Sequence, residues 1–162
     1  MKFKVHVNSL VSARSENEAR EKFKQLLLAD GNIQLEKADD ILTSPLKVYR
    51  NLKSIRQLKK EVFVGVALNS RNGIIKKEVI SIGTLNSALV HPREVFEFAI
   101  RHSAAAIIIA HNHPSGNTEP SEEDIKVTKR LADAGEIIGI EVLDHLIVSH
   151  TGYTSLKEKD LL

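Results

Sequence analysis

Residues 104–124 read AAAIIIAHNHPSGNTEPSEED. The apolar run at 104–110 predicts a strand that is buried on both faces. His111 and His113 follow directly, and side chains two positions apart on a strand point to the same side. We therefore expect the two imidazoles to converge on one point at the edge of a sheet, where loops come together.

A carboxylate, Asp124, follows eleven residues after His113, where Pro120 and Ser121 indicate the start of a helix. Two imidazoles and one carboxylate leave a fourth position open on a divalent metal ion, as in catalytic zinc sites. Simpler interpretations exist for each residue. A histidine at a strand end often only forms a hydrogen bond, and Ser121 with Asp124 fits a capping box that needs no metal. Together, however, the motifs exceed what packing requires.

Composition limits the remaining possibilities. The chain has 162 residues, of which 42% are hydrophobic and 27% charged, with a net charge of +2. It contains no cysteine, so disulfides and thiolate ligands are excluded, and any metal must be held by histidine, carboxylate and water. The longest apolar run has seven residues, too few for a membrane span, and the N-terminus does not resemble a signal peptide. We expect a cytoplasmic protein without a membrane partner.

Basic residues gather in the first part of the chain. Residues 1–60 carry 13 Lys and Arg against 7 Asp and Glu. Ser44 and Pro45 predict the start of a helix, and five cations recur along it at steps of three. They are Lys47, Arg50, Lys53, Arg56 and Lys59. The pattern fits a solvated helix face, and it also fits a patch that contacts nucleic-acid phosphates.

The remaining pattern predicts an α/β (α+β) fold in two parts. Residues 1–42 form a small β-α-β appendage of unknown role, with a strand at Phe3 to Val7, a helix after Ser15 and a strand near Ile33. Residues 43–162 form a mixed sheet flanked by helices. Its expected strands are 62–68, 74–82, 104–110, 141–149 and 153–156, with helices at 92–102 and 122–134 and a hairpin turn at 69–73.

Several motifs resemble one known family. His111-x-His113-Pro114 followed by Ser121-x-x-Asp124 is similar to the JAMM signature of the JAB/MPN metalloproteases, and within that group to the RadC family. Further RadC-like segments are GTLN at 83–86, VHPRE at 90–94 and VLDH at 142–145. The resemblance covers residues 43–162 and implies the JAB/MPN, cytidine-deaminase-like architecture. It does not cover residues 1–42, where RadC proteins usually carry a helix-hairpin-helix region that is not visible here.

The resemblance implies a zinc ion held by His111, His113 and Asp124, with water in the fourth position. It also implies a general base, for which Glu78 is the matching candidate, although Glu78 next to two lysines also fits an exposed strand carboxylate. Ser121 matches the serine that polarises the scissile carbonyl. We therefore expect a zinc metallopeptidase that hydrolyses amide or isopeptide bonds of a peptide or protein substrate.

An alternative function remains open. RadC-like proteins are associated with DNA repair, so the chain fits a nucleic-acid-binding or partner-binding module with a vestigial metal site. Asp144 and His145, in an apolar strand, fit either a buried hydrogen-bonded pair or groups that orient a ligand histidine. The sequence identifies neither the substrate nor the oligomeric state.

Overall fold

The structure is a computed structural model that describes residues 2–4, 10–12, 41–83 and 90–162. The chain divides into two units, Met1–Gln34 and Leu35–Leu162. Among the helices within the described ranges, none combines the length and the apolar character that crossing a membrane requires.

In the first unit two short strands form an antiparallel pair. They are β1 (Lys2–Lys4) and β2 (Leu10–Ser12), and Phe3 pairs with Val11. The sequence predicts a strand near β1 but not β2, because three residues are too few to show the two-residue alternation of a strand. The helix after Ser15 and the strand near Ile33 lie outside the described residues.

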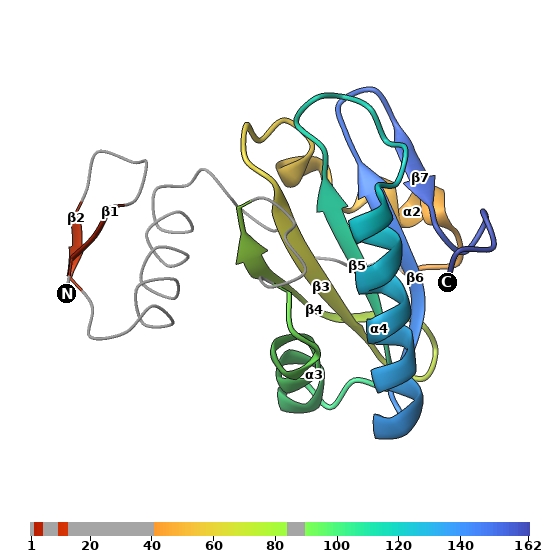
Figure 1. Cartoon of the computed structure of the whole chain (residues 1–162). Coiled ribbons are helices and arrows are strands. Elements are labelled where there is room, and N and C mark those ends of the chain that lie inside the picture. The colour runs from red at the N-terminus through yellow and green to blue at the C-terminus, as the bar shows by residue number, and fades with distance from the viewer. Residues whose placement is uncertain (1, 5–9, 13–40, 84–89) are drawn as a thin grey trace. The chain divides into compact units, whose positions relative to one another are not determined.

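The second unit is built on a five-stranded sheet with the order β4-β3-β5-β6-β7. The strands are β3 (Val62–Leu68), β4 (Ile74–Ile82), β5 (Ala106–Asn112), β6 (Glu141–Val148) and β7 (Tyr153–Ser155). β5 and β6 are parallel, and every other neighbouring pair is antiparallel. Figure 1 shows β3, β5 and β6 side by side at the centre of this unit. The predicted mixed sheet is confirmed.

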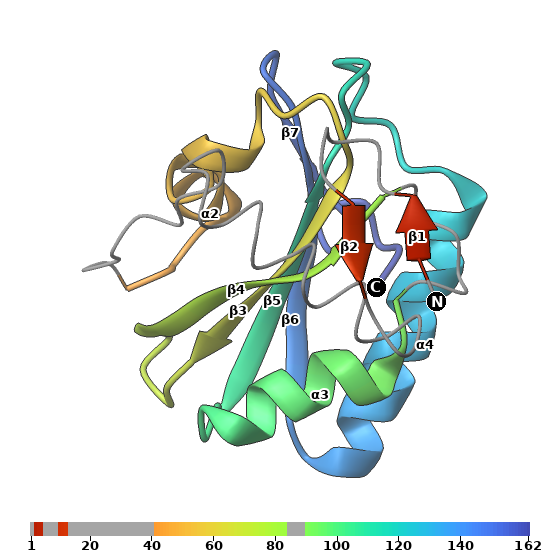
Figure 2. The same cartoon turned by 90° about the vertical axis from the view of Figure 1, so that its left-hand side faces the viewer.

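Helices cover both faces of this sheet. Figure 2 shows α3 (Pro92–Arg101) and α4 (Glu122–Ile138) on one side and α2 (Pro45–Arg50) on the other. The core under α3 and α4 includes Phe63, Ile107 and Ile109 from the sheet. Every residue of β3 and of β5 is buried, as expected for central strands covered from both sides.

The strand that carries the histidines lies two residues later than predicted. Ser103 adopts a positive φ of 49°, and the amide of Ala104 donates to Ala99 at the end of α3. The first alanines of the apolar run therefore complete the turn from α3, and β5 begins at Ala106 and includes His111 and Asn112.

α4 is longer than predicted because Gly135 does not end it. A Cβ at Gly135 would lie 2.6 Å from the main-chain oxygen of Ile140 and 3.2 Å from the ring of Phe96, so glycine allows the helix to approach its surroundings closely. The helix ends at Gly139, which caps it in the left-handed conformation with φ 79°.

The basic segment does not form one helix. α2 ends at Arg50, and a short 3-10 turn, η1 (Lys53–Ile55), follows it. The side chain of Asn51 donates to the main-chain oxygen of Lys47, and such local bonds compete with helix continuation. The five cations predicted along this segment therefore do not share a single helix face.

Candidate metal centre

The two histidines meet as their spacing predicts. Their Nε2 atoms lie 3.0 Å apart, with His111 inside β5 and His113 directly after it. Nδ1 of His113 lies 2.7 Å from the main-chain oxygen of Asn117. Because a carbonyl oxygen can only accept, Nδ1 carries the hydrogen and Nε2 keeps a lone pair for a metal ion.

Asp124 joins them from the first turn of α4. Its Oδ1 lies 3.2 Å from Nε2 of His111, and its Oδ2 lies 3.6 Å from Nε2 of His113. The predicted capping box is also present, since Ser121 donates to Oδ2 through both its amide and its hydroxyl at 2.7 Å. The helix cap and the cluster therefore occur together, and the cap orients the carboxylate toward the histidines.

The donor set fits a small transition-metal ion. His111, His113 and Asp124 form a group that could hold a metal ion. Ligands at 2.0–2.1 Å from a tetrahedral zinc ion lie about 3.3 Å from one another, close to the spacings found here. Two imidazoles and one carboxylate suit zinc and related metals better than calcium or magnesium.

Burial and hydrogen bonding set the protonation of this group. Burial lowers the pKa of His111, whereas the hydrogen bond to Asp124 raises the pKa of the partly exposed His113. Burial alone would raise the pKa of Asp124, but hydrogen bonds from His111 and His113 hold it well below its usual range. Asp124 is thus ionised and His111 neutral, as metal ligands must be.

Ser121 is engaged with Asp124. Its hydroxyl donates to Oδ2 of Asp124 and accepts from the amide of the same residue at 3.2 Å. In this arrangement the serine fixes a metal ligand. Its predicted contact with a substrate carbonyl requires the hydroxyl to turn away from Asp124.

Glu78 does not join the group. It lies on β4, where it pairs with Gly65, and Gly65 pairs in turn with Ile109 of β5. Glu78 is therefore two strand spacings of about 4.8 Å from the histidine strand. Its carboxylate contacts α3 instead, with Oε1 at 3.0 Å from Arg101 and Oε2 at 3.7 Å from His102.

A different carboxylate, Glu61, lies near the histidines. It immediately precedes β3, which is the direct neighbour of β5, and Phe63 pairs with His111. Residues two apart on a strand share a face, so Glu61 lies on the same face as Phe63 and His111. Its charge raises the pKa of both His111 and His113. No local pattern marks Glu61 in the sequence, because its closeness to the histidines depends on the pairing of β3 with β5.

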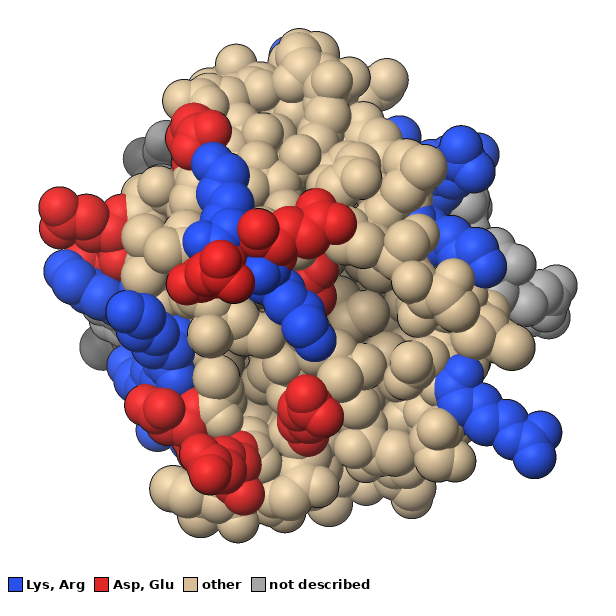
Figure 3. All heavy atoms as spheres, turned by 90° about the vertical axis from the view of Figure 1, so that its right-hand side faces the viewer, with Lys and Arg blue, Asp and Glu red and all other residues tan. Residues whose placement is uncertain are grey.

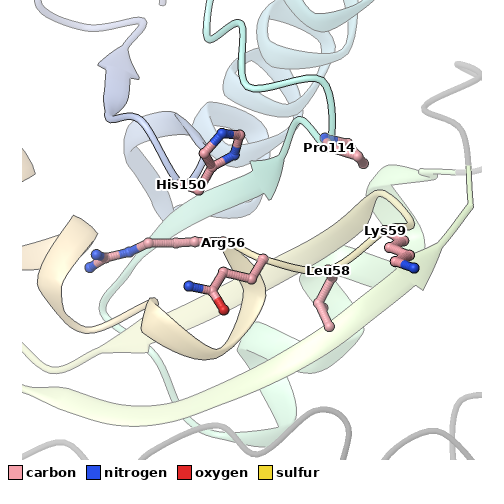
Figure 4. A pocket seen from close by; sticks show the side chains of 6 residues that line it. Arg56, Leu58, Lys59, Pro114 and His150 are labelled. Atoms are coloured by element: carbon pink, nitrogen blue, oxygen red, sulfur yellow. The ribbon is translucent and has the colours of Figure 1, made fainter.

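A groove of about 510 Å³ lies at the same edge of the sheet. Figure 4 shows His150 and Pro114 across from Arg56, Leu58 and Lys59. Pro114 directly follows the ligand candidate His113, and Lys59 precedes Glu61 by two residues. The groove therefore begins beside the segments that carry the metal centre.

The predicted phosphate-contacting surface is altered by the fold. The guanidinium of Arg56 lies 3.5 Å over the ring of Tyr49 and donates to the main-chain oxygen of the same residue, and Lys47 donates to Ile41. Arg50, Lys53 and Lys59 are exposed. On the face drawn in Figure 3, basic and acidic side chains are largely interspersed. Binding of nucleic acid through these residues stays a prediction.

The chain is similar to several UPF0758 proteins. The chain is 56% identical to a UPF0758 protein of Desulforamulus reducens over 111 aligned residues. The aligned region covers 68% of this chain and 49% of the relative. It is 58% identical over 111 residues to a UPF0758 protein of Moorella thermoacetica, covering 68% and 48%. A UPF0758 protein of Rubrobacter xylanophilus is 56% identical over 123 residues, covering 75% and 54%.

The chain thus spans about half the length of the curated relatives it matches. A family model described as the RadC-like JAB domain matches residues 42–161, which include the whole candidate metal centre. The resemblance predicted from the sequence motifs is confirmed, and the chain belongs to the RadC family.

Proposed function

We propose that this protein is a zinc-dependent hydrolase of amide or isopeptide bonds. The proposal rests on the convergence of His111, His113 and Asp124, whose donor atoms have the spacing of a metal site. His113 is partly exposed, whereas the other two residues are buried, so the group is accessible from the His113 side. Bound zinc would supply Lewis acidity, which lowers the pKa of water from 15.7 toward about 7.

Glu61 is the proposed general base, in place of Glu78. It lies on the sheet face that carries His111, and its charge acts on both ligand histidines. A carboxylate in this position can accept a proton from the attacking water and then deliver it to the leaving amine. The ion pair of Glu78 with Arg101 assigns that residue to the contact between β4 and α3.

Ser121 contributes by holding Asp124. The hydroxyl and amide of Ser121 both donate to Oδ2, which leaves Oδ1 directed at His111. Stabilisation of an oxyanion by the same hydroxyl is a second proposed role. It would require Oγ to exchange its bond with Oδ2 for one with the substrate oxygen.

The groove between His150, Pro114 and Lys59 is the proposed site for the segment that flanks the scissile bond. Its size suits a few residues of an extended peptide. Arg56 and Lys59 carry positive charge, and the residues that line the groove include no carboxylate. A peptide with acidic residues near the scissile bond matches this lining best.

Hydrolysis of a peptide and isopeptide library by the purified protein tests the function. We expect about one zinc ion per chain by elemental analysis, together with cleavage that a chelator removes and added zinc restores. A protein without a stoichiometric divalent metal would overturn the proposal. Salt-sensitive DNA binding without any cleavage would favour the module with a vestigial site instead.

Two matched substitutions test which glutamate is the base. Glu61→Gln should keep the metal and the fold while lowering the cleavage rate by about 10²–10⁴-fold, the usual contribution of a general base. Glu78→Gln removes a carboxylate of the same kind from the neighbouring strand and should leave the rate within a few-fold of the wild type. The opposite result would restore Glu78 as the base.

A further inference from the structure

Two fully buried polar residues, His145 and Thr128, lie behind the ligand histidine. His145 on β6 pairs with Ile109 of β5, so its side chain is on the sheet face that carries His111. Thr128 lies four residues after Asp124 on α4 and therefore on the same side of that helix. The fold thus brings both residues to the metal group from elements that are distant in sequence.

Short contacts connect these residues in a chain. Oγ1 of Thr128 lies 2.6 Å from the main-chain oxygen of Asp124 and 2.5 Å from Nδ1 of His145. Nε2 of His145 then lies 2.8 Å from Nδ1 of His111. The remaining nitrogen of His111, Nε2, is the atom directed at the metal group.

The direction of every hydrogen bond in this series follows from its first acceptor, the main-chain oxygen of Asp124. A carbonyl oxygen cannot donate, so the single hydroxyl hydrogen of Thr128 points to Asp124. Nδ1 of His145 must then donate to Thr128. A neutral imidazole has one N–H and one lone pair, so Nε2 of His145 accepts a hydrogen from Nδ1 of His111.

The reverse direction of these hydrogen bonds brings two oxygen atoms together at Thr128 without a hydrogen between them. If Nε2 of His111 carried the hydrogen and donated to Asp124, His145 would have to accept from Thr128. The hydroxyl oxygen of Thr128 and the main-chain oxygen of Asp124 would then lie 2.6 Å apart without a hydrogen between them. That arrangement is repulsive. The Nδ1–H tautomer instead leaves Nε2 of His111 without a hydrogen at 3.2 Å from Oδ1 of Asp124, and a bound cation removes that repulsion, so the hydrogen bonds favour the Nδ1–H tautomer in the metal-bound site.

We propose that His145 and Thr128 are positioning residues that hold His111 in the Nδ1–H tautomer in the metal-bound site. The lone pair of Nε2 is then directed at the metal ion. The proposal rests on the metal site of the proposed function but not on the hydrolysis of any substrate. The ring of Phe63 packs against both imidazoles, with centroid distances of 6.2 Å to His111 and 5.6 Å to His145, and shields the bond between them.

Two measurements on the full chain test this inference. The first is the tautomer of His145 in the zinc-bound wild-type protein, read from ¹⁵N chemical shifts of the imidazole nitrogens. The second is zinc affinity, measured by competition with a chromogenic chelator. Thr128→Val keeps the shape of the side chain but removes the hydroxyl, and Thr128→Ser restores the hydroxyl. Ser155→Ala is the control, because it removes a buried hydroxyl that binds Asp144 and not His145.

We expect Nδ1–H at His145 in the zinc-bound wild type and a 10–100-fold loss of zinc affinity in Thr128→Val, the usual effect of losing a partner of a ligand histidine. Thr128→Ser and Ser155→Ala should stay within about threefold of the wild type. Hydrogen on Nε2 of His145 in the zinc-bound wild type would overturn the inference, even if the valine variant does not fold. Equal zinc affinity in folded Thr128→Val would also overturn it. Zinc binding without cleavage would defeat the proposed function and leave the inference standing, whereas a wild type that binds no zinc would overturn both.

Discussion

Replacing Asn112 should destabilise the second unit far more than replacing an exposed asparagine with similar bonds. Asn112 lies between the two ligand histidines, on the opposite face of β5, and is fully buried. Its Oδ1 accepts from the amide of Val62 at 2.7 Å, and its Nδ2 donates to the main-chain oxygens of Leu58 and Lys60 at 3.2 and 3.0 Å. These bonds tie the segment next to Glu61 to the histidine strand.

The magnitude follows from the burial of each partner. In Asn112→Ala the buried amide of Val62 is left without its acceptor, which costs about 1–3 kcal/mol, and the two partly buried carbonyls lose about 0.5–1 kcal/mol each. The expected decrease in the free energy of unfolding is therefore about 2–5 kcal/mol. Zinc binding by the folded variant should change little, because the lost side chain points away from the metal group.

Urea titration followed by tyrosine fluorescence measures this effect. The chain has no tryptophan, and its two tyrosines, Tyr49 and Tyr153, pack together in the second unit with ring centroids 5.0 Å apart. Asn69→Ala is the control, since Asn69 accepts from the amides of Arg71 and Gly73 on the exposed hairpin turn. It should cost less than about 1 kcal/mol, because water can replace its bonds. A loss below 1 kcal/mol for Asn112→Ala, or an equal loss for both variants, would refute the reasoning.

Two further predictions concern packing and pH. Gly135→Ala should destabilise by about 1–3 kcal/mol in the same titration, because the added Cβ meets the oxygen of Ile140. Gly152→Ala is the control, because nothing lies within 4 Å of its added atom, and it should change the free energy of unfolding by less than about 0.5 kcal/mol. An unchanged free energy of unfolding in Gly135→Ala would contradict the close approach of α4 to Ile140. Burial lowers the pKa of His111 and of His145, so their contribution to stability is complete above about pH 6.5 and is lost as the pH falls below it. The hydrogen bond to Asp124 raises the pKa of His113, whose contribution is instead lost as the pH rises above about 6.5. In chelator, the free energy of unfolding should therefore fall between about pH 6.5 and 5 by up to 1.4 kcal/mol per pH unit for each of the two buried histidines. His145→Gln should show a shallower decrease, and an unchanged slope would show that His145 is not buried as a neutral group.

The parts of the site geometry that the sequence predicts and the structure contains are those set by local rules. The i and i+2 spacing of His111 and His113 on a strand, and the capping box of Ser121 and Asp124, depend on a few neighbouring residues. Strand identities followed from apolar runs, and the order of helices and strands from Leu42 onward agreed with the expected mixed sheet.

Relations between distant segments could not be predicted in the same way. Glu61 directly precedes β3 and Glu78 lies on β4, and only the strand order shows that β3 is the strand next to the histidines. Likewise, the contact of His145 with His111 depends on the parallel register of β5 and β6. The role of Gly135 depends on how closely α4 approaches Ile140 and Phe96, which the helical pattern does not reveal.

The bond chain behind His111 ends on a main-chain oxygen, and this affects how the site can change during evolution. Any residue at position 124 supplies that oxygen, so a substitution there removes the carboxylate but not the acceptor for Thr128. A lineage that loses the acidic ligand would keep an imidazole pair with its hydrogens in place. Restoring aspartate at position 124 would then complete the proposed ligand set again, so loss of this carboxylate is a reversible step.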